Sequence, residues 1–260
     1  MTSKSYWGGQ FCIVTGAASG IGLATAQLLS SNGATVLGLD RSKDAGTSAN
    51  LFAEGNNLYR KCDLSVPEEI EKIFAEFKTS KLAALFNVAG LPTNGLGIEE
   101  TSVSDWDRII NVNLRAVFLT AKYSLPLFKN NGGGAIVNVS SVHAYSTMKN
   151  HAAYAASKGG MNSLTTELAI ELNPQSIRVV GVAPGSIRTP MTTTDLKRDS
   201  ELLNSLGFPT DGKSIGHVGE PEEIARILTW CASSEASFIT GTTIQADGGL
   251  LSRLGYEKGN

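Results

Sequence analysis

Short runs of apolar residues alternate along the chain with longer segments in which apolar positions recur every three or four residues. The first pattern predicts buried strands, and the second predicts amphipathic helices. The predicted strands cover residues 11–14, 34–39, 58–62, 82–88, 135–140, 177–182 and 242–246. The predicted helices cover residues 21–31, 104–129, 151–172 and 221–232, and another begins at Pro67 with Ser65 as its expected N-cap. Strands that alternate with helices predict an α/β fold with a doubly wound, seven-stranded parallel sheet.

No linker or change in composition divides the chain, so we expect residues 1–260 to form a single domain. One stretch, about 189–216, breaks the alternation because it is long, polar and lies beyond a strand end. Ligands of such sheets bind at the carboxyl ends of the strands, which makes this stretch a candidate lid. A solvent-exposed excursion without a function is the alternative.

Composition narrows the classes of function. Hydrophobic residues make up 42% of the 260 residues, and the formal net charge is −2, so a nucleic-acid-binding surface is not expected. No apolar run is long enough to cross a membrane, and residues 1–10 lack the apolar segment of a signal peptide. The three cysteines are odd in number and lack metal-ligand spacing, so we expect reduced thiols, no metal site and a cytoplasmic protein.

The turn after the first predicted strand reads Thr-Gly-Ala-Ala-Ser-Gly-Ile-Gly over residues 15–22. Glycines let the backbone approach a pyrophosphate, and the helix that follows favours an anion at its N-terminus. Asp40 ends the second strand, 18 positions beyond Gly22. A carboxylate there can bind both ribose hydroxyls of NAD and would repel the 2′-phosphate of NADP. NAD is therefore favoured over NADP, although the neighbouring Arg41 can turn inward toward that phosphate.

A second group of residues suggests proton transfer. Tyr154 and Lys158 are four residues apart, so both lie on one face of the predicted helix. An ammonium near a phenol lowers the pKa of the phenol and makes it a usable base. Ser141 follows the fifth strand, and its hydroxyl can bind a substrate oxygen. A tyrosine and lysine at this spacing are, taken alone, more often part of a solvated helix face.

Taken together, the motifs resemble those of the short-chain dehydrogenase/reductase family, over roughly residues 7–249. Gly16, Gly20 and Gly22 match the family's T-G-x-x-x-G-x-G pattern, and the spacing of Ser141, Tyr154 and Lys158 matches its active site. The resemblance implies a Rossmann fold, with Tyr154 as acid and base, Lys158 on the nicotinamide ribose and Ser141 on the substrate oxygen. Asn113 corresponds to a fourth member, which bends the long helix and holds a water that relays protons.

The resemblance also implies the cofactor contacts. Asp63 matches the acid that binds the adenine amino group, and residues 184–189 match a P-G-x-I-x-T loop that holds the carboxamide. Val88 departs from the family by replacing the second asparagine of an N-N-A-G strand end. The full expected set is Gly16, Ser19, Gly20, Ile21, Gly22, Asp40, Arg41, Asp63, Leu64, Asn87, Ala89, Gly90, Tyr154, Lys158, Pro184, Gly185, Ile187 and Thr189.

The expected activity is NAD-dependent interconversion of a secondary alcohol and a ketone. Two alternatives stay open: an NADPH-dependent ketoreductase of acyl thioesters or polyketides, and a non-redox binding protein or cyclase. The expected substrate contacts are Ser141, His143, Tyr154 and Ser186. His143 can bind a second substrate oxygen or lie at the surface, and few cations line the pocket, which favours a neutral substrate.

The family resemblance also implies a homotetramer or homodimer. The helix from Ser104 and the helix that carries Tyr154 resemble those that pair between subunits in this family. Residues 250–256 can add further contacts. We expect a small alcohol or ketone as the binding partner, and neither nucleic acid nor a membrane.

Overall fold

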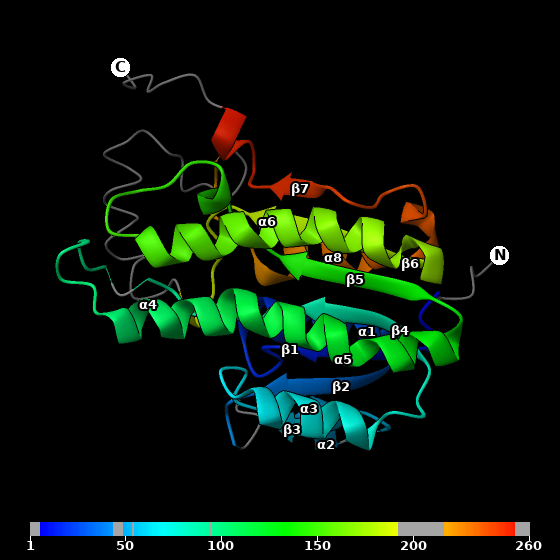
Figure 1. Cartoon of the computed structure of the whole chain (residues 1–260). Coiled ribbons are helices and arrows are strands. Elements are labelled where there is room, and N and C mark those ends of the chain that lie inside the picture. The colour runs from blue at the N-terminus through cyan, green and yellow to red at the C-terminus, as the bar shows by residue number, and fades with distance from the viewer. Residues whose placement is uncertain (1–5, 44–48, 54, 94, 192–215, 253–260) are drawn as a thin grey trace.

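The computed structural model describes residues 6–43, 49–53, 55–93, 95–191 and 216–252. Within these residues, seven strands form one parallel sheet in the order β3-β2-β1-β4-β5-β6-β7 (Figure 1). The strands are β1 (Phe11–Thr15), β2 (Thr35–Asp40), β3 (Leu58–Lys61), β4 (Leu82–Asn87), β5 (Gly134–Val139), β6 (Ile177–Pro184) and β7 (Thr243–Ala246). The predicted α/β Rossmann fold is confirmed, and each predicted strand lies within two residues of its observed bounds.

Helices cover both faces of the sheet. They are α1 (Gly20–Ser31), α2 (Ala49–Ala53), α3 (Pro67–Glu76), α4 (Val103–Ile110), α5 (Ala116–Asn131), α6 (Ala152–Leu172) and α8 (Pro221–Ala232). Successive side chains of a strand point to opposite faces. Accordingly, Ile13 packs in a core with α3, α5 and α6, while Cys12 and Val14 pack in a second core with α1 and α8. Figure 1 shows α5 and α6 in front of the sheet, with α1 and α8 behind it.

The strand order reverses between β1 and β4. Strands β2 and β3 lie on one side of β1, and strands β4 to β7 follow one another on its other side. Such a reversal opens a crevice at the carboxyl ends of the strands, where ligands of doubly wound sheets bind. Thr15 joins the two strands at this point. Its hydroxyl accepts hydrogen bonds from the amides of Val88 and Ala89, at 3.0 and 3.1 Å, and donates to the carbonyl of Phe86 at 3.4 Å.

The long helical stretch predicted for residues 104–129 is found, but it is not a regular α-helix throughout. A π-helical turn, η2 (Asn111–Arg115), separates α4 from α5. Such turns add one residue to the helical repeat and often mark functional sites. Asn113 lies inside this turn and is fully buried, so the wider turn lets a polar side chain point into the interior.

Some other features differ from the expectations, and some predicted segments lie outside the described residues. Ser65 is not the cap of α3, since Val66 holds that position, and the Ser65 hydroxyl instead donates to Asp63 at 2.7 Å. The short helix α2 was not predicted, because its five residues carry too little periodicity. Most of the candidate lid, residues 192–215, and residues 253–256 of the predicted C-terminal contact lie outside the described part of the chain.

Candidate active site

Ser141 lies where β5 ends, at the start of a short 3-10 turn, η3 (Val142–Ala144). The extended backbone of Ser141 makes it the cap of this turn, and its hydroxyl oxygen accepts the amide hydrogen of His143 at 3.2 Å. The neighbouring Ser140 donates its hydroxyl to the carbonyl of Lys158 at 3.3 Å. The end of β5 and helix α6 are therefore tied together next to the predicted catalytic residues.

Tyr154 and Lys158 lie in the first two turns of α6, as the spacing predicts. The Lys158 side chain is buried, and its Nζ donates to the carbonyl of Val139 at 2.7 Å. The same Nζ lies 5.7 Å from the centre of the Tyr154 ring. The structure thus brings Ser141, Tyr154 and Lys158 together at the carboxyl end of β5.

The electrostatics of this group differ from the expectation. Burial raises the pKa of Tyr154, and a hydrogen bond with Ser141 opposes that rise. Burial also lowers the pKa of Lys158 to about 8. The shift of the Tyr154 pKa is therefore opposite to the lowering expected from lysine, because burial disfavours a charge on either side chain. Tyr154 is therefore a neutral acid here.

Asn113 connects three parts of the site. Its amide donates to the carbonyl of Leu91 at 3.0 Å and to the hydroxyl of Ser157 at 3.2 Å, while its oxygen accepts the amide hydrogen of Leu91 at 2.7 Å. Ser157 in turn donates to the carbonyl of Tyr154 at 2.7 Å. The loop after β4 is thereby fixed to the helical turn that carries Tyr154.

Gly90 lies at the centre of this arrangement. A Cβ atom added there would lie 3.5 Å from the Asn113 side-chain oxygen and 3.7 Å from Lys158 Nζ. Glycine at this position keeps the space beside both polar groups open. The predicted residues Asn113, Gly90 and Lys158 therefore face one another.

The glycine-rich turn has little room for side chains. Gly16 has φ +72°, and a Cβ there would lie 2.9 Å from Ala89 Cα. A Cβ on Gly22 would overlap the carbonyl oxygen of Gly16. The backbone of the turn therefore packs directly against the start of α1 and the end of β4, which leaves the amides at the helix N-terminus to face a ligand.

Asp40 lies beside this turn, as predicted. Its carboxylate accepts the amide hydrogen of Ala18 at 3.1 Å and that of Ser42 at 3.0 Å. Asp63 accepts both the amide and the hydroxyl of Ser65, which lowers the pKa of Asp63, and the nearby charge of Arg41 lowers it further. A glycine-lined turn with a carboxylate next to it fits the phosphates and ribose of a dinucleotide.

Two predicted cofactor contacts have side chains that are used elsewhere. Leu64 is buried in the core on the α3 side of the sheet, so only its backbone can meet a cofactor. The Asn87 side chain donates to Asn138 at 2.9 Å and accepts from Thr120 at 2.8 Å. Asn138 continues this buried chain to Thr165 at 3.0 Å.

Sequence reasoning missed this polar chain between α5, β4, β5 and α6. An asparagine inside the β-branched run 135–139 was the available signal, because a buried amide needs hydrogen-bonding partners.

The loop after β6 closes the other side of the crevice. The amide of Arg188 donates to the carbonyl of Gly219 at 2.9 Å, and Gly219 donates back to the carbonyl of Ser186 at 2.9 Å. The guanidinium of Arg188 forms an ion pair with Glu220 at 2.9 Å. Thr189 packs over the glycine-rich turn, since a Cβ on Gly20 would lie 3.1 Å from its methyl group. The predicted loop 184–189 therefore meets the predicted turn 15–22.

His143 lies against the edge of Tyr154, with ring centres 5.5 Å apart and planes at 82°. Its ring also stacks on His151 at 4.6 Å. His143 was expected either to contact the substrate or to lie at the surface, and the structure places its ring beside Tyr154.

The described residues contain neither a cluster of possible metal ligands nor a helix suited to cross a membrane. No group of three His, Cys, Asp or Glu side chains is arranged to hold a metal ion in that part of the chain. Within the same ranges, no helix combines the length and hydropathy that a membrane span needs.

Known proteins are similar to nearly the whole chain. A family model described as enoyl-(acyl carrier protein) reductase matches residues 16–251. The chain is 38% identical over 252 residues to the 3-oxoacyl-[acyl-carrier-protein] reductase FabG of Thermotoga maritima. The match covers 94% of this chain and 98% of that protein. It is 35% identical over 247 residues to the cyclohexanol dehydrogenase of an Acinetobacter species, covering 93% and 94%.

A solved structure is similar as well. It belongs to a protein of Beutenbergia cavernae that is provisionally assigned as an NAD(P)-dependent gluconate 5-dehydrogenase and contains NADP at low occupancy. The two chains are 29% identical, with a TM-score of 0.86, and the match covers 96% of this chain and 100% of that one.

Proposed function

The chain belongs to the short-chain dehydrogenase/reductase family, and we propose that it oxidises a neutral secondary alcohol to a ketone with NAD as the preferred cofactor. As a member of this family it is an oxidoreductase that acts on CH–OH groups with NAD(P). The proposal rests on one observation above the others: Tyr154, Ser141 and Lys158 meet at the end of β5, in the crevice beside the glycine-rich turn.

In the proposed mechanism, Ser141 and Tyr154 hold the reacting oxygen between their hydroxyl groups. A nicotinamide cofactor held in this crevice would supply the redox chemistry, as acceptor or donor of the hydride. In ketone reduction, neutral Tyr154 donates its proton to the developing alkoxide. In alcohol oxidation, Tyr154 must first lose that proton. Lys158 can carry it away, because an amine with a pKa of about 8 exchanges protons near neutral pH.

The preference for NAD is inferred from Asp40. Its carboxylate lies at the amide of Ala18, within the turn that would bind the pyrophosphate. A carboxylate at this position accepts hydrogen bonds from ribose hydroxyls and repels a phosphate there. The charge of Arg41 is close enough to Asp63 to lower the pKa of that carboxyl, so a cation lies near the proposed adenine contact as well as next to Asp40 in the sequence.

An absorbance assay of the reduced nicotinamide tests the proposal. Purified protein is incubated with cyclohexanol or another secondary alcohol and with NAD or NADP at equal concentration. We expect kcat/KM to be at least about tenfold higher with NAD, and Asp40→Ser to reduce that ratio. Tyr154→Phe should lower kcat by about 10²- to 10⁴-fold, because the proton donor and acceptor is lost, while NADH binding changes little.

Tyr123→Phe, on α5, is the matched control, since it removes a phenolic hydroxyl outside the site. Near-normal turnover by the Tyr154→Phe variant would refute the mechanism. Higher kcat/KM with NADP would refute the cofactor assignment.

An NADPH-dependent ketoreductase is the second candidate, and it is favoured by the similarity to the acyl-carrier-protein reductase of T. maritima. Against it stands the carboxylate of Asp40, which we propose meets the ribose. A non-redox binding protein or cyclase is a weaker alternative, because binding alone needs neither a buried lysine nor a paired serine and tyrosine.

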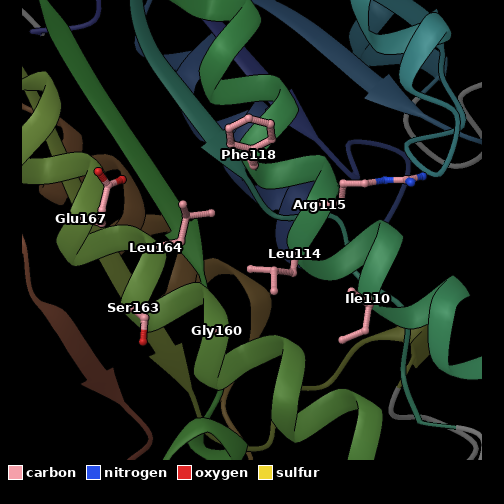
Figure 2. A pocket seen from close by; sticks show the side chains of 8 residues that line it. All are labelled: Ile110, Leu114, Arg115, Phe118, Gly160, Ser163, Leu164 and Glu167. Carbon is pink, nitrogen blue, oxygen red and sulfur yellow. The ribbon is translucent and has the colours of Figure 1, made fainter.

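We also propose that two copies of the chain pair through α5 and α6, within a homodimer or homotetramer. A groove of about 540 Å³ lies between α6 and the helical stretch that runs from the end of α4 into α5, and Figure 2 shows side chains of both sides lining it. Its lining is mostly apolar: Ile110, Leu114, Arg115, Phe118, Gly160, Ser163, Leu164 and Glu167. In Figure 2, Arg115 and Glu167 lie on opposite sides. A two-fold axis through the groove can therefore pair the arginine of each copy with the glutamate of the other.

The domain and compartment assignments remain proposals. We propose one domain for residues 1–260, supported by the single sheet of the described strands. A cytoplasmic location is supported by Cys12, Cys62 and Cys231, which are free and buried.

A further inference from the structure

We propose that His143, supported by His151, binds a second oxygen of the substrate, so that the preferred substrates are diols, polyols or hydroxyketones rather than simple alcohols. This inference rests on the proposed function, because it concerns the same pocket. It assigns a specificity-determining role to His143 and a positioning role to His151.

The backbone places the His143 ring next to the reacting position. Its amide donates to the Ser141 hydroxyl at 3.2 Å, which fixes the residue one turn from the predicted oxygen-binding serine. Its ring meets the Tyr154 ring edge-to-face, with centres 5.5 Å apart. An oxygen bound by this imidazole would lie close to the oxygen held by Ser141 and Tyr154. The two oxygens could therefore belong to neighbouring carbons of one substrate molecule.

One of the two ring nitrogens of His143 has a hydrogen-bonding partner within the protein. Its Nδ1 lies 2.8 Å from the Thr147 hydroxyl, so Nε2 is the nitrogen left for a ligand. Burial and the neighbouring His151 lower the pKa of His143 to about 4, so the ring is neutral at neutral pH. A neutral imidazole nitrogen donates or accepts one hydrogen bond according to the tautomer, and thus suits a hydroxyl or a carbonyl without requiring a charged substrate.

His151 holds this ring in place. The two imidazoles are nearly parallel, with planes 7° apart and centres separated by 4.6 Å. The His151 Nδ1 lies 2.7 Å from the carbonyl of Lys149, and since a carbonyl only accepts, this Nδ1 carries the hydrogen. The interaction fixes the orientation of the His151 ring and, through stacking, that of His143.

The residue before His151 supports the same arrangement. Asn150 has φ +66°, a left-handed conformation that asparagine tolerates better than most residues. Its carbonyl accepts the hydroxyl of Thr93 at 2.7 Å, which joins the loop after β4 to the loop that carries both histidines. Backbone strain held by cross-loop contacts is typical of ligand-binding sites.

A substrate pair tests the specificity role. We measure kcat/KM for cyclohexanol and for cis-1,2-cyclohexanediol, which differ by one hydroxyl, with the preferred nicotinamide cofactor. The wild-type protein should favour the diol by about tenfold or more, the worth of one hydrogen bond to a polar group. His143→Phe keeps an aromatic ring beside Tyr154 and should abolish the preference, while His143→Gln should retain part of it. Lys149→Gln is the matched control, because it leaves the carbonyl that His151 uses.

The positioning role has its own readout. His151→Ala should raise KM for the diol about threefold more than KM for cyclohexanol, and His151→Phe, which can still stack, should restore the ratio. Circular dichroism and NADH binding establish that each variant is folded. If His143→Phe does not fold, the role of His143 is tested by the diol preference of His143→Gln and by the KM ratios of the two His151 variants.

The outcomes separate the two claims. Equal kcat/KM for diol and cyclohexanol in the wild-type protein, or a diol preference that survives in His143→Phe, overturns this inference and leaves the proposed function standing. No turnover of any secondary alcohol by the wild-type protein overturns the proposed function, and this inference with it.

Discussion

At the scale of single residues, Lys158 shows that a residue of the proposed active site can lower the stability of the folded protein. The lysine is buried, and its Nζ donates to the carbonyl of Val139 at 2.7 Å. Burial lowers its pKa from 10.5 to about 8 in the folded protein. Between these two values the unfolded chain binds more protons than the folded chain, so the stability contributed by this residue rises with pH. Below about pH 8 the buried charge is present and its penalty is complete.

Replacement of this lysine should make the effect measurable. The free energy of unfolding of the wild-type protein, relative to Lys158→Met, should rise by about 3 kcal/mol between pH 7 and pH 11, because only the wild type carries the titrating amine. Urea denaturation at several pH values measures the difference. Lys129→Met, an exposed lysine on α5, controls for the loss of a surface charge. A difference that is constant with pH would contradict the depressed pKa.

Sequence motifs pointed to many of the residues in the crevice, but not to their protonation or to the orientation of their rings. The spacing of Ser141, Tyr154 and Lys158 predicted that these side chains lie together, and Asp40 lies beside the glycine-rich turn as predicted. The protonation of Tyr154 depends instead on how deeply the surrounding chain buries it, which spacing along a helix does not reveal. The same holds for the stacking of two histidines that lie eight positions apart.

At the scale of secondary-structure elements, Arg178 on β6 joins the end of α8 to the sheet. Its guanidinium donates to four carbonyls, those of Cys231, Ala232, Ser233 and Ile239, at 2.8 to 3.1 Å. The last carbonyls of a helix have no partner within the helix, and a cation favours that end. One side chain therefore caps α8 and holds the segment that leads to β7.

Removal of this cap should destabilise the protein. Arg178→Met should lower the free energy of unfolding by about 2–4 kcal/mol, because several partly buried carbonyls lose their donors. Arg178→Lys, which has fewer donors and no planar fork, should lie between. Urea denaturation gives the values, and Arg226→Met on the exposed side of α8 is the control. Equal stability of the two methionine variants would exclude the capping role.

Element prediction succeeded where the hydrophobic period was regular and failed where tertiary contacts overrode it. The predicted bounds of α8, 221–232, match those observed, because Pro221 marks its first turn and the apolar positions keep one phase. The helix predicted from 104 to 129 was interrupted, because the hydrogen bonds of Asn113 to the distant Leu91 favour a wider turn. A long-range contact of this kind leaves no local pattern.

At the scale of the whole molecule, the proposed pairing of two copies depends on the groove beside α6. Phe118 is 47% exposed within this groove, although it is a large apolar side chain. Phe118→Glu should halve the mass of the assembly or reduce it further, because the substitution places a charge in the centre of an apolar contact. Light scattering coupled to size-exclusion chromatography measures the mass.

Ile98→Glu, which changes an apolar side chain that is 76% exposed and outside the groove, should leave the assembly intact. A monomeric wild-type protein, or equal effects of the two variants, would contradict pairing through this groove.

The π-helical turn at residues 111–115 links the interior of the molecule to its exterior. Asn113 points inward to Leu91 and Ser157, while Leu114, Arg115 and Phe118 line the groove on the outside. Because a π-helical turn holds one residue more than an α-helical turn, deleting one residue here would restore a regular helix and leave α5 in nearly its present orientation. The groove lining would keep its phase, whereas the wide turn that lets the Asn113 side chain reach Leu91 would be lost. A single deletion can therefore separate the inner role of this turn from its outer one.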